Sequence, residues 1–353
     1  MLKINCLLIL LSLLSACKIQ AQTQVWDRKA EDAVKSSKRL IVLLLDPTDL
    51  PNDKKFKKRP ELVKAYEKYV GEFNEMIKPP IQAHWRLTQQ IDFMSVRDLI
   101  ALRNKAGKQE LGETLVLRFP MVEYNFMYAI SSLSTEEVAD FSAEKGRVDD
   151  DYVQNISLYN LRDVRPFSAN SVTSGPNSFL AEYYCNRWFL TTAEIAFALE
   201  NMQEVIQLKA KKTCDEYCVV FDPANKGKLA AKTLLIPAEY TIKAKNGKKT
   251  IDETELKSAY PWPWRFASVA EIAEAIVKKD ADKAVLFSTQ YLPTGPLFGT
   301  YFWVVDAADA RTILGYSTPG NLNVGVGTVA KENGLNDLNL RRVKEIVKGA
   351  KKE

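Results

Sequence analysis

Two stretches decide the fold of this 353-residue chain: Ile91-Asp92-Phe93-Met94-Ser95-Val96-Arg97-Asp98-Leu99 and Trp264-Arg265-Phe266-Ala267-Ser268-Val269-Ala270-Glu271-Ile272. In each, an aromatic and aliphatic run leads into a serine that is followed three positions later by an acid. This is the capping-box pattern, in which the serine oxygen accepts a helix-start amide and the carboxylate reaches back. Each stretch therefore predicts a strand that ends where a capped helix begins.

Further matches flank both stretches at a spacing of about 170 to 177 residues. The matched pairs are residues 40–45 with 217–221, 114–119 with 284–288, and 124–128 with 301–305. Such a recurrent spacing is the signature of an internal repeat. We therefore predict a duplication in which Phe93 and Phe266 occupy equivalent places in two superposable units.

Strands alternate with helices in both halves of the chain. In the first half a helix is expected over residues 60–77 and ends at Pro79-Pro80, because proline lacks an amide donor. In the second half only a short helix, residues 252–259, is expected there. The pattern predicts an α/β fold (α+β is the alternative) of two tandem, duplicated units, each with helices packed on a mixed sheet.

The first unit is expected to span residues 17–180 and the second residues 181–353. A loop-rich stretch, residues 164–175, is placed near the join, and a hairpin of residues 301–306 and 312–316 closes the second sheet. A basic C-terminal helix ends the second unit. Its expected apolar stripe is Leu340, Val343, Ile346, Val347 and Ala350.

The first sixteen residues are expected to be a secretory signal. A start with the single charge of Lys3 precedes an apolar run, residues 6–14, which is too short for a membrane span of about 20 residues. The run ends on Leu14-Ser15-Ala16-Cys17, which resembles the lipobox of bacterial lipoproteins. This resemblance covers the signal alone. It implies lipid on Cys17 and an anchor in the membrane of a bacterial cell envelope, facing the periplasm or the cell surface. The alternative is cleavage after Ala21, which would give a soluble periplasmic or secreted protein.

Composition excludes few functions. The formal charge of +5 is small and spread along the chain, so no nucleic-acid partner is expected. The hydrophobic share of 46% and the charged share of 26% are those of an ordinary globular protein.

Cys214 and Cys218 form the one close cysteine pair downstream of the signal. A local disulfide in an oxidising compartment and two half-buried thiols at a strand start are both compatible with the spacing. The Cys-x3-Cys spacing is similar to copper-chaperone motifs of thioredoxin-like proteins, but Val219 stands where proline often follows there. Thiol or copper handling is therefore an alternative function.

The single histidine, His84, limits catalytic and metal chemistry. A Ser-His-Asp or Cys-His mechanism would have to use it, and the commonest metal clusters need more than one. Because His84 follows Pro79-Pro80 and adjoins Trp85, a structural role where a helix passes into a strand is expected. We expect no cofactor and no metal.

The second stretch is preceded by more aromatic residues. Tyr260, Trp262, Trp264 and Phe266 alternate with Ala259, Pro261, Pro263 and Arg265, so on a strand the four rings share one face. Pro261 and Pro263 favour a sheet edge, since proline cannot donate to a ladder. The rings either fill the core or form a flat strip for sugar rings or an extended peptide. We expect one of Trp262 and Trp264 to be buried and the other partly exposed.

Three functional hypotheses result. The leading one is a non-enzymatic envelope protein that binds or scaffolds a partner, an envelope protein or a glycan, near the membrane. The second is a carbohydrate- or peptidoglycan-active enzyme whose carboxylates are not identifiable among the 44 acids. The third is a thiol or copper-handling protein that uses Cys214 and Cys218. A deep cleft with paired acids would favour the second, and opposed sulfurs in an open pocket the third.

Overall fold

The computed structural model describes residues 23–25, 27–47, 58–120, 154–168, 171–174, 179–185, 190–212, 223–238, 240–243, 252–291, 299–318 and 337–351. Its helices are α2 (Asp27–Ser36), α4 (Pro60–His84), α5 (Val96–Lys105), α6 (Lys108–Glu113), α9 (Thr192–Ala210), α10 (Glu253–Ala259), α11 (Val269–Val277) and α12 (Leu340–Lys351), with 3₁₀ turns η2 (Leu161–Asp163) and η3 (Pro223–Ala231). Its strands are β1 (Thr23–Val25), β2 (Arg39–Leu43), β3 (Gln90–Met94), β4 (Thr114–Arg118), β5 (Gln154–Asn160), β6 (Val164–Ser168), β7 (Ser171–Ser174), β8 (Phe179–Cys185), β9 (Thr233–Pro237), β10 (Thr241–Lys243), β11 (Trp264–Ala267), β12 (Lys283–Tyr291), β13 (Gly299–Asp306), β14 (Thr312–Thr318) and β15 (Asp337–Asn339).

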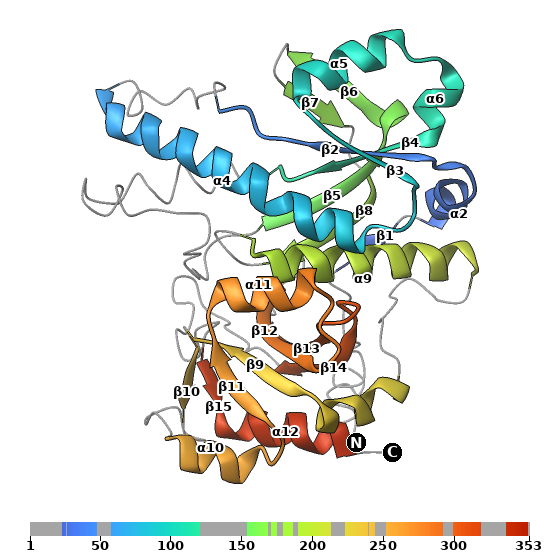
Figure 1. Ribbon diagram of the computed structural model, residues 1–353. Coiled ribbons are helices and arrows are strands. Elements are labelled where there is room, and N and C mark those ends of the chain that lie inside the picture. The colour runs from blue at the N-terminus through green and yellow to red at the C-terminus, as the bar shows by residue number, and fades with distance from the viewer. Residues whose placement is uncertain are drawn as a thin grey trace, which may run out of the picture.

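The two large sheets share one topology. The first sheet has the strand order β1-β8-β5-β4-β2-β3 and the second has the order β14-β13-β12-β9-β11. Counted from the edge strands β3 and β11, five strands correspond: β3 with β11, β2 with β9, β4 with β12, β5 with β13, and β8 with β14. In both sheets the first three of these strands are parallel, and the next two follow antiparallel. The chain therefore consists of two α/β units, each a mixed sheet with packed helices (Figure 1).

The duplication is confirmed at its central stretches. Phe93 lies opposite Val42 on the neighbouring strand, and Phe266 lies opposite Ile236 in the same way. The oxygens of Ser95 and Ser268 accept from Asp98 N and Glu271 N, so both cap the helix that follows.

Two outer matches of the repeat are wrong. The counterpart of β2 is β9, not residues 217–221, and the counterpart of β13 is β5, not residues 124–128. Residues 217–221 and 124–128 lie outside the described residues. A short apolar run recurs often by chance, whereas position in the sheet is set by the hydrogen-bond ladder.

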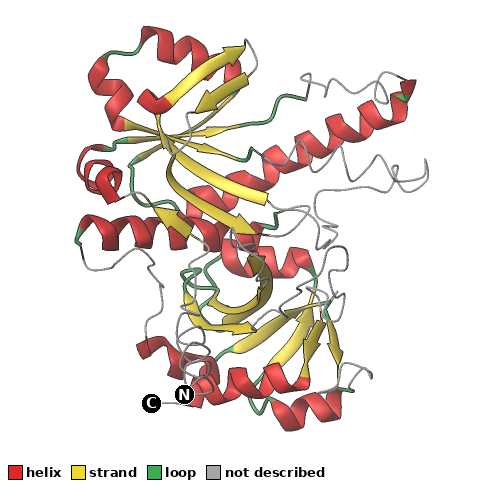
Figure 2. Ribbon diagram, turned by 180° about the vertical axis from the view of Figure 1, so that it is seen from behind, coloured by secondary structure: helices red, strands yellow, loops and turns green. Residues whose placement is uncertain are grey.

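Each sheet is covered by helices on both faces. On the first sheet, Ile41, Leu43 and Val116 face an outer layer that includes Leu99 of α5 and Leu111 of α6. On the second sheet, the outer face packs against α10 and α12 through Leu256, Val343 and Ile346. The alternate residues of both sheets turn inward to one shared cluster. Figures 1 and 2 show the resulting order of layers: helices, sheet, helices, sheet, helices.

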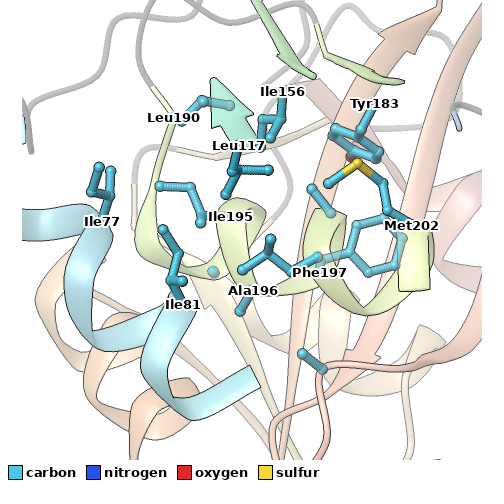
Figure 3. Packing of buried hydrophobic residues seen from close by; sticks show 14 of the residues in the cluster. Ile77, Ile81, Leu117, Ile156, Tyr183, Leu190, Ile195, Ala196, Phe197 and Met202 are labelled. Atoms are coloured by element: carbon cyan, nitrogen blue, oxygen red, sulfur yellow. The ribbon is translucent and has the colours of Figure 1, made fainter. Parts of the chain in front are cut away.

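Helix α9 lies at the centre of the helical layer between the two sheets. Fourteen of its 19 residues are buried, which is the pattern of a helix enclosed on all sides. The ring of Phe197 lies 6.0 Å from that of Tyr183 in the first sheet, and 4.9 Å from that of Phe287 in the second. Its capping box, Thr191 with Glu194, sets where the helix begins. The core of α9 and its neighbours is drawn in Figure 3. The two units thus bury one continuous core between them.

The first sheet continues beyond the expected boundary between residues 180 and 181. Strand β8 runs to Cys185 and pairs with both β5 and β1. Residue 181 is therefore the middle of a strand in the first sheet, and α9 follows that strand.

The long helix does not end at Pro79-Pro80 as expected. Helix α4 continues through both prolines to His84, and Trp85 N still donates to Ile81 O. Ile81 and His84 are fully buried, so packing holds the last turn in place. The carbonyls that lose their proline partners belong to Glu75 and Met76, two residues that line an open cleft.

Within the predicted loop of residues 164–175, the described residues 164–168 and 171–174 form two strands. They are the antiparallel pair β6–β7, with Val164 opposite Ser174. The turn-forming residues that suggested a loop belong to this short pair. The second-unit hairpin, β13–β14, is confirmed, and so is the C-terminal helix α12, whose predicted apolar stripe packs on the second sheet.

Candidate binding surface

Strand β11 is the edge of the second sheet. It pairs with β9 on one side, and within the described residues no strand pairs with its other side. Phe266 on this strand is 39% exposed, and it is the one exposed large hydrophobic residue of the described part of the chain. We take this surface as the candidate site because the exposed ring of Phe266 lies on an edge strand beside the half-buried ring of Trp264.

The four rings of the aromatic segment form two pairs that become more exposed along the chain. Tyr260 is buried, Trp262 and Trp264 are half-buried, and Phe266 is exposed. The ring planes of Tyr260 and Trp262 meet at 89° with centroids 5.4 Å apart, and those of Trp264 and Phe266 at 88° and 5.6 Å. The rings are therefore not a flat strip, and burial raises the pKa of the Tyr260 hydroxyl above its usual range.

Two expectations for this segment are wrong. Trp262 and Trp264 are both half-buried and pack against the cluster on the outer face of the sheet, so neither is fully enclosed. Strand β11 begins only at Trp264, and Tyr260 ends helix α10 as its C-cap. The alternation of rings thus spans a helix end, a short connection and a strand.

Arg265 covers part of the outer edge of β11. Its Nη1 donates to the carbonyl oxygen of Phe266 at 3.2 Å and to Glu271 Oε1 at 2.8 Å. Glu271 also accepts from the backbone N–H of Ser268, and these contacts hold the pKa of its carboxyl below its usual range. A charged side chain over an edge carbonyl discourages further strands from pairing there.

His84 lies in a buried polar network between the two units. Its Nδ1 is 3.3 Å from Glu200 Oε1 on α9, and its Nε2 is 3.2 Å from the carbonyl oxygen of Ile276 on α11. Arg86 forms an ion pair with the second carboxylate oxygen of Glu200. His84 is fully buried and both ring nitrogens are engaged, so it ties three helices together.

Gln203, one turn after Glu200, completes this network. Its Nε2 donates to the carbonyl oxygen of His84 at 2.9 Å, and its Oε1 accepts from Arg86 N at 2.6 Å. Sequence reasoning missed Glu200, Gln203 and Arg86. The available signal was that Glu200 and Gln203 stand three apart, a spacing that places both on one face of the helix.

An open cleft of about 610 Å³ lies where α4 meets α9 and α11. Its lining residues are Glu72, Glu75, Met76, Pro79, Thr192, Ala273, Glu274 and Val277. The three carboxylates pair with lysines of their own helices, Lys68, Lys78 and Lys278. The charge of these carboxylates is therefore largely balanced by lysines.

The remaining predicted sites lie outside the described residues: Cys17, Cys214 and Cys218. Among the residues that are described, no group of three or more His, Cys, Asp or Glu side chains is placed to hold a metal ion. Within the same residues, no helix combines the length and the apolar character needed to cross a bilayer.

Comparison with known proteins gives this chain no relative. No protein-family model, no curated protein and no solved structure matches it. Function therefore has to be argued from the site itself.

Proposed function

We propose that the chain is a non-enzymatic binding protein of the bacterial cell envelope. In this proposal, lipid on Cys17 tethers it to the membrane, and the surface of Trp264 and Phe266 on β11 recognises a partner protein. We call these two residues and their edge strand the aromatic edge.

The observation that carries the proposal is the exposure of Phe266. An aromatic ring contributes more to protein recognition than most side chains, because it buries a large area at little cost in conformational entropy. Trp264 stands against it at 88° and is itself half-buried, so the exposed ring is held in place rather than free.

The ring geometry favours a protein over a glycan. Stacking on a sugar needs a flat ring face that is open to solvent, as expected of a flat strip. Here each ring pair meets almost at a right angle, which leaves an uneven surface suited to side chains that fit between the rings. A glycan partner is therefore the weaker alternative.

Site-specific photo-cross-linking tests this proposal. A photoreactive phenylalanine analogue placed at position 266 in growing cells should give a discrete protein adduct. The control carries the analogue at Asn104, an exposed position on α5 of the first unit. The proposal is wrong if position 266 gives no adduct, or only those that position 104 also gives.

A further inference from the structure

The buried ring of His84 faces a hydrogen-bond acceptor at each of its two nitrogens. Nδ1 lies 3.3 Å from Oε1 of Glu200 on α9, and Nε2 lies 3.2 Å from the carbonyl oxygen of Ile276 on α11. A carbonyl oxygen can only accept a hydrogen bond, and so can an ionised carboxylate. A neutral imidazole carries one ring proton, so it can donate to only one of these partners. Both contacts are satisfied together only when the ring carries two protons.

The ionisation of Glu200 decides where the second proton lies. If this carboxyl were protonated, it could itself donate to a neutral ring. Its other oxygen, Oε2, accepts from the guanidinium of Arg86, which stays charged at all ordinary pH values. The side chain of Glu200 is only 3% exposed, so this cation takes the place of water around the carboxylate. A neighbouring cation stabilises the ionised carboxylate, and the proton therefore belongs on the ring.

Two helix ends also favour a positive charge on the ring. His84 lies in the last turn of α4, and Ile276 lies in the last turn of α11. The C-terminal end of a helix carries a partial negative charge, because its carbonyl dipoles are aligned, and it stabilises a cation placed there. The ring is thus next to one carboxylate and to two helix ends of negative sign.

The other charged groups nearby come from the elements that pack against α4, which include α9 and α11. Arg86 is the positive neighbour, and 45% of its side chain is exposed, so water screens its charge. Glu204, one turn after Glu200 on α9, interacts with Glu200, Arg86, Arg311 and Asp309. The charged side chains of α11 and of the residues just after it are exposed: Glu271, Glu274, Lys278 and Lys279.

We infer that the folded chain holds His84 as a buried imidazolium, and that its second proton helps to join the two units. The ring belongs to α4 of the first unit, and the carbonyl of Ile276 belongs to the second. When the imidazolium releases a proton to the solvent in alkaline solution, it can no longer donate to Glu200 and to Ile276 together. The joint between the units is therefore sensitive to pH. This inference does not depend on the binding role of the aromatic edge.

The direction of the pH effect follows from proton linkage. An unfolded histidine gives up its second proton above about pH 6.5, whereas the folded ring retains it. The unfolded state then binds fewer protons than the folded state, so the free energy of unfolding falls as the pH rises. The stabilisation is fully present below about pH 6.5, and it is lost as the folded ring itself releases the proton.

Nitrogen NMR tests the protonation state directly, because His84 is the single histidine of the chain. The full chain is labelled with ring-labelled histidine, purified in detergent without a histidine tag, and measured at about pH 8, folded and in urea. The two ring nitrogens have nearly equal chemical shifts in an imidazolium and widely separated shifts in a neutral ring. We expect the imidazolium pattern in the folded chain and the neutral pattern in urea. A neutral folded ring whose Nδ1 accepts a hydrogen bond would overturn the inference.

Urea unfolding tests whether the proton stabilises the joint. The midpoints of the wild type and of His84→Gln are compared between about pH 6 and about pH 9. Glutamine still offers a donor but does not titrate, and the other titrating groups are common to both chains. We expect the midpoint of the wild type to fall more over this range than that of His84→Gln. Parallel profiles would overturn the role of the proton in the joint.

Hydrogen exchange on the wild type decides the same question if His84→Gln does not fold. After correction for the intrinsic effect of pH, the amides of α11 should lose protection as the pH is raised from about 6 to about 9. The amides of α5 are the control, since this helix lies on the outer face of the first sheet. If α11 and α5 keep the same relative protection over this range, the joint does not respond to the proton and the inference is wrong.

Discussion

Phe93 and Phe266 hold the same position on the edge strands of two sheets in which five strands correspond, and of these two residues only Phe266 is exposed. Phe93 is half-buried against the shared core cluster, whereas Phe266 is 39% exposed beside the half-buried ring of Trp264. The pair also provides a matched comparison of packing and recognition.

Truncation of the two rings should affect stability unequally. We expect Phe93→Ala to lower the free energy of unfolding by about 2 kcal/mol or more, because its ring packs against the core. Phe266→Ala should change it by less than about 1 kcal/mol, since much of its ring is already in water. Urea unfolding followed by circular dichroism measures both. Equal losses would contradict the assignment of Phe266 as a surface residue.

Removing the charge of Glu200 should be costly. Glu200→Gln leaves the buried ring of His84 and the guanidinium of Arg86 without their shared carboxylate. We expect a loss of about 3 kcal/mol in the free energy of unfolding. Glu204→Gln is the control, since burial raises the pKa of Glu204 and removing its charge relieves that cost. The free energy of unfolding of Glu204→Gln should stay within about 1 kcal/mol of the wild type. If Glu204→Gln is instead destabilised more than Glu200→Gln, the role given to the Glu200 network is wrong.

Two equivalent lysines offer a test of buried against exposed ion pairs. Lys232 precedes β9 and pairs with Asp306 at 2.9 Å, with side chains only 9% and 8% exposed. Lys38 precedes β2 and pairs with Glu113 at the same distance, but is 68% exposed. Lys232→Met should lower the free energy of unfolding by about 3–5 kcal/mol, because it leaves the buried carboxylate of Asp306 without its charged partner. Lys38→Met should cost less than about 1 kcal/mol. Thermal and urea unfolding of both variants would decide.

Stability should fall in acid partly through Glu271. Hydrogen bonds from the Ser268 backbone, and then from the Arg265 and Ser268 side chains, lower the pKa of Glu271 in the folded chain. A carboxyl with a depressed folded pKa contributes stability above its unfolded pKa, and this contribution is lost as the pH falls through the folded value. Between about pH 7 and about pH 3, the wild type should therefore lose more stability than Glu271→Gln. Parallel pH profiles would argue against the capping contacts.

Lipidation of Cys17 is testable without structural information. If the Leu14-Ser15-Ala16-Cys17 segment is a lipobox, Cys17→Ser should move the protein from the membrane fraction to the soluble fraction. Mass spectrometry of the wild type should then find a modified cysteine at the mature terminus. An unmodified terminus at Gln22 would instead mean ordinary cleavage after Ala21 and no anchor.

Much of the fold could be predicted because its signals are local. Short segments of a few residues specify each of these features: the serine caps, the hairpin β13–β14, the apolar stripe of α12 and the alternation of strands with helices. The central repeat was visible for the same reason, since Phe93-Met94-Ser95 and Phe266-Ala267-Ser268 encode the same strand end and helix start.

The errors arose where distant contacts override local preference. Pro79-Pro80 did not end α4, because Ile81 and His84 are held by packing against other elements. The outer repeat matches were misplaced, because strand partners are chosen by register and not by composition. The Glu200 network joins residues more than one hundred positions apart, and a local sequence pattern cannot predict such a pairing.

The amino-acid sequence by itself determined the class of the fold, the central duplication and the alternation of the aromatic segment, because periodicity and capping act within a few residues. Only the tertiary structure decided that Trp262 and Trp264 are both half-buried and that Phe266 is exposed. Exposure depends on what covers a face. On the outer face of the second sheet that cover comes from α10 and α12, two helices far apart in the sequence that only the folded chain brings together.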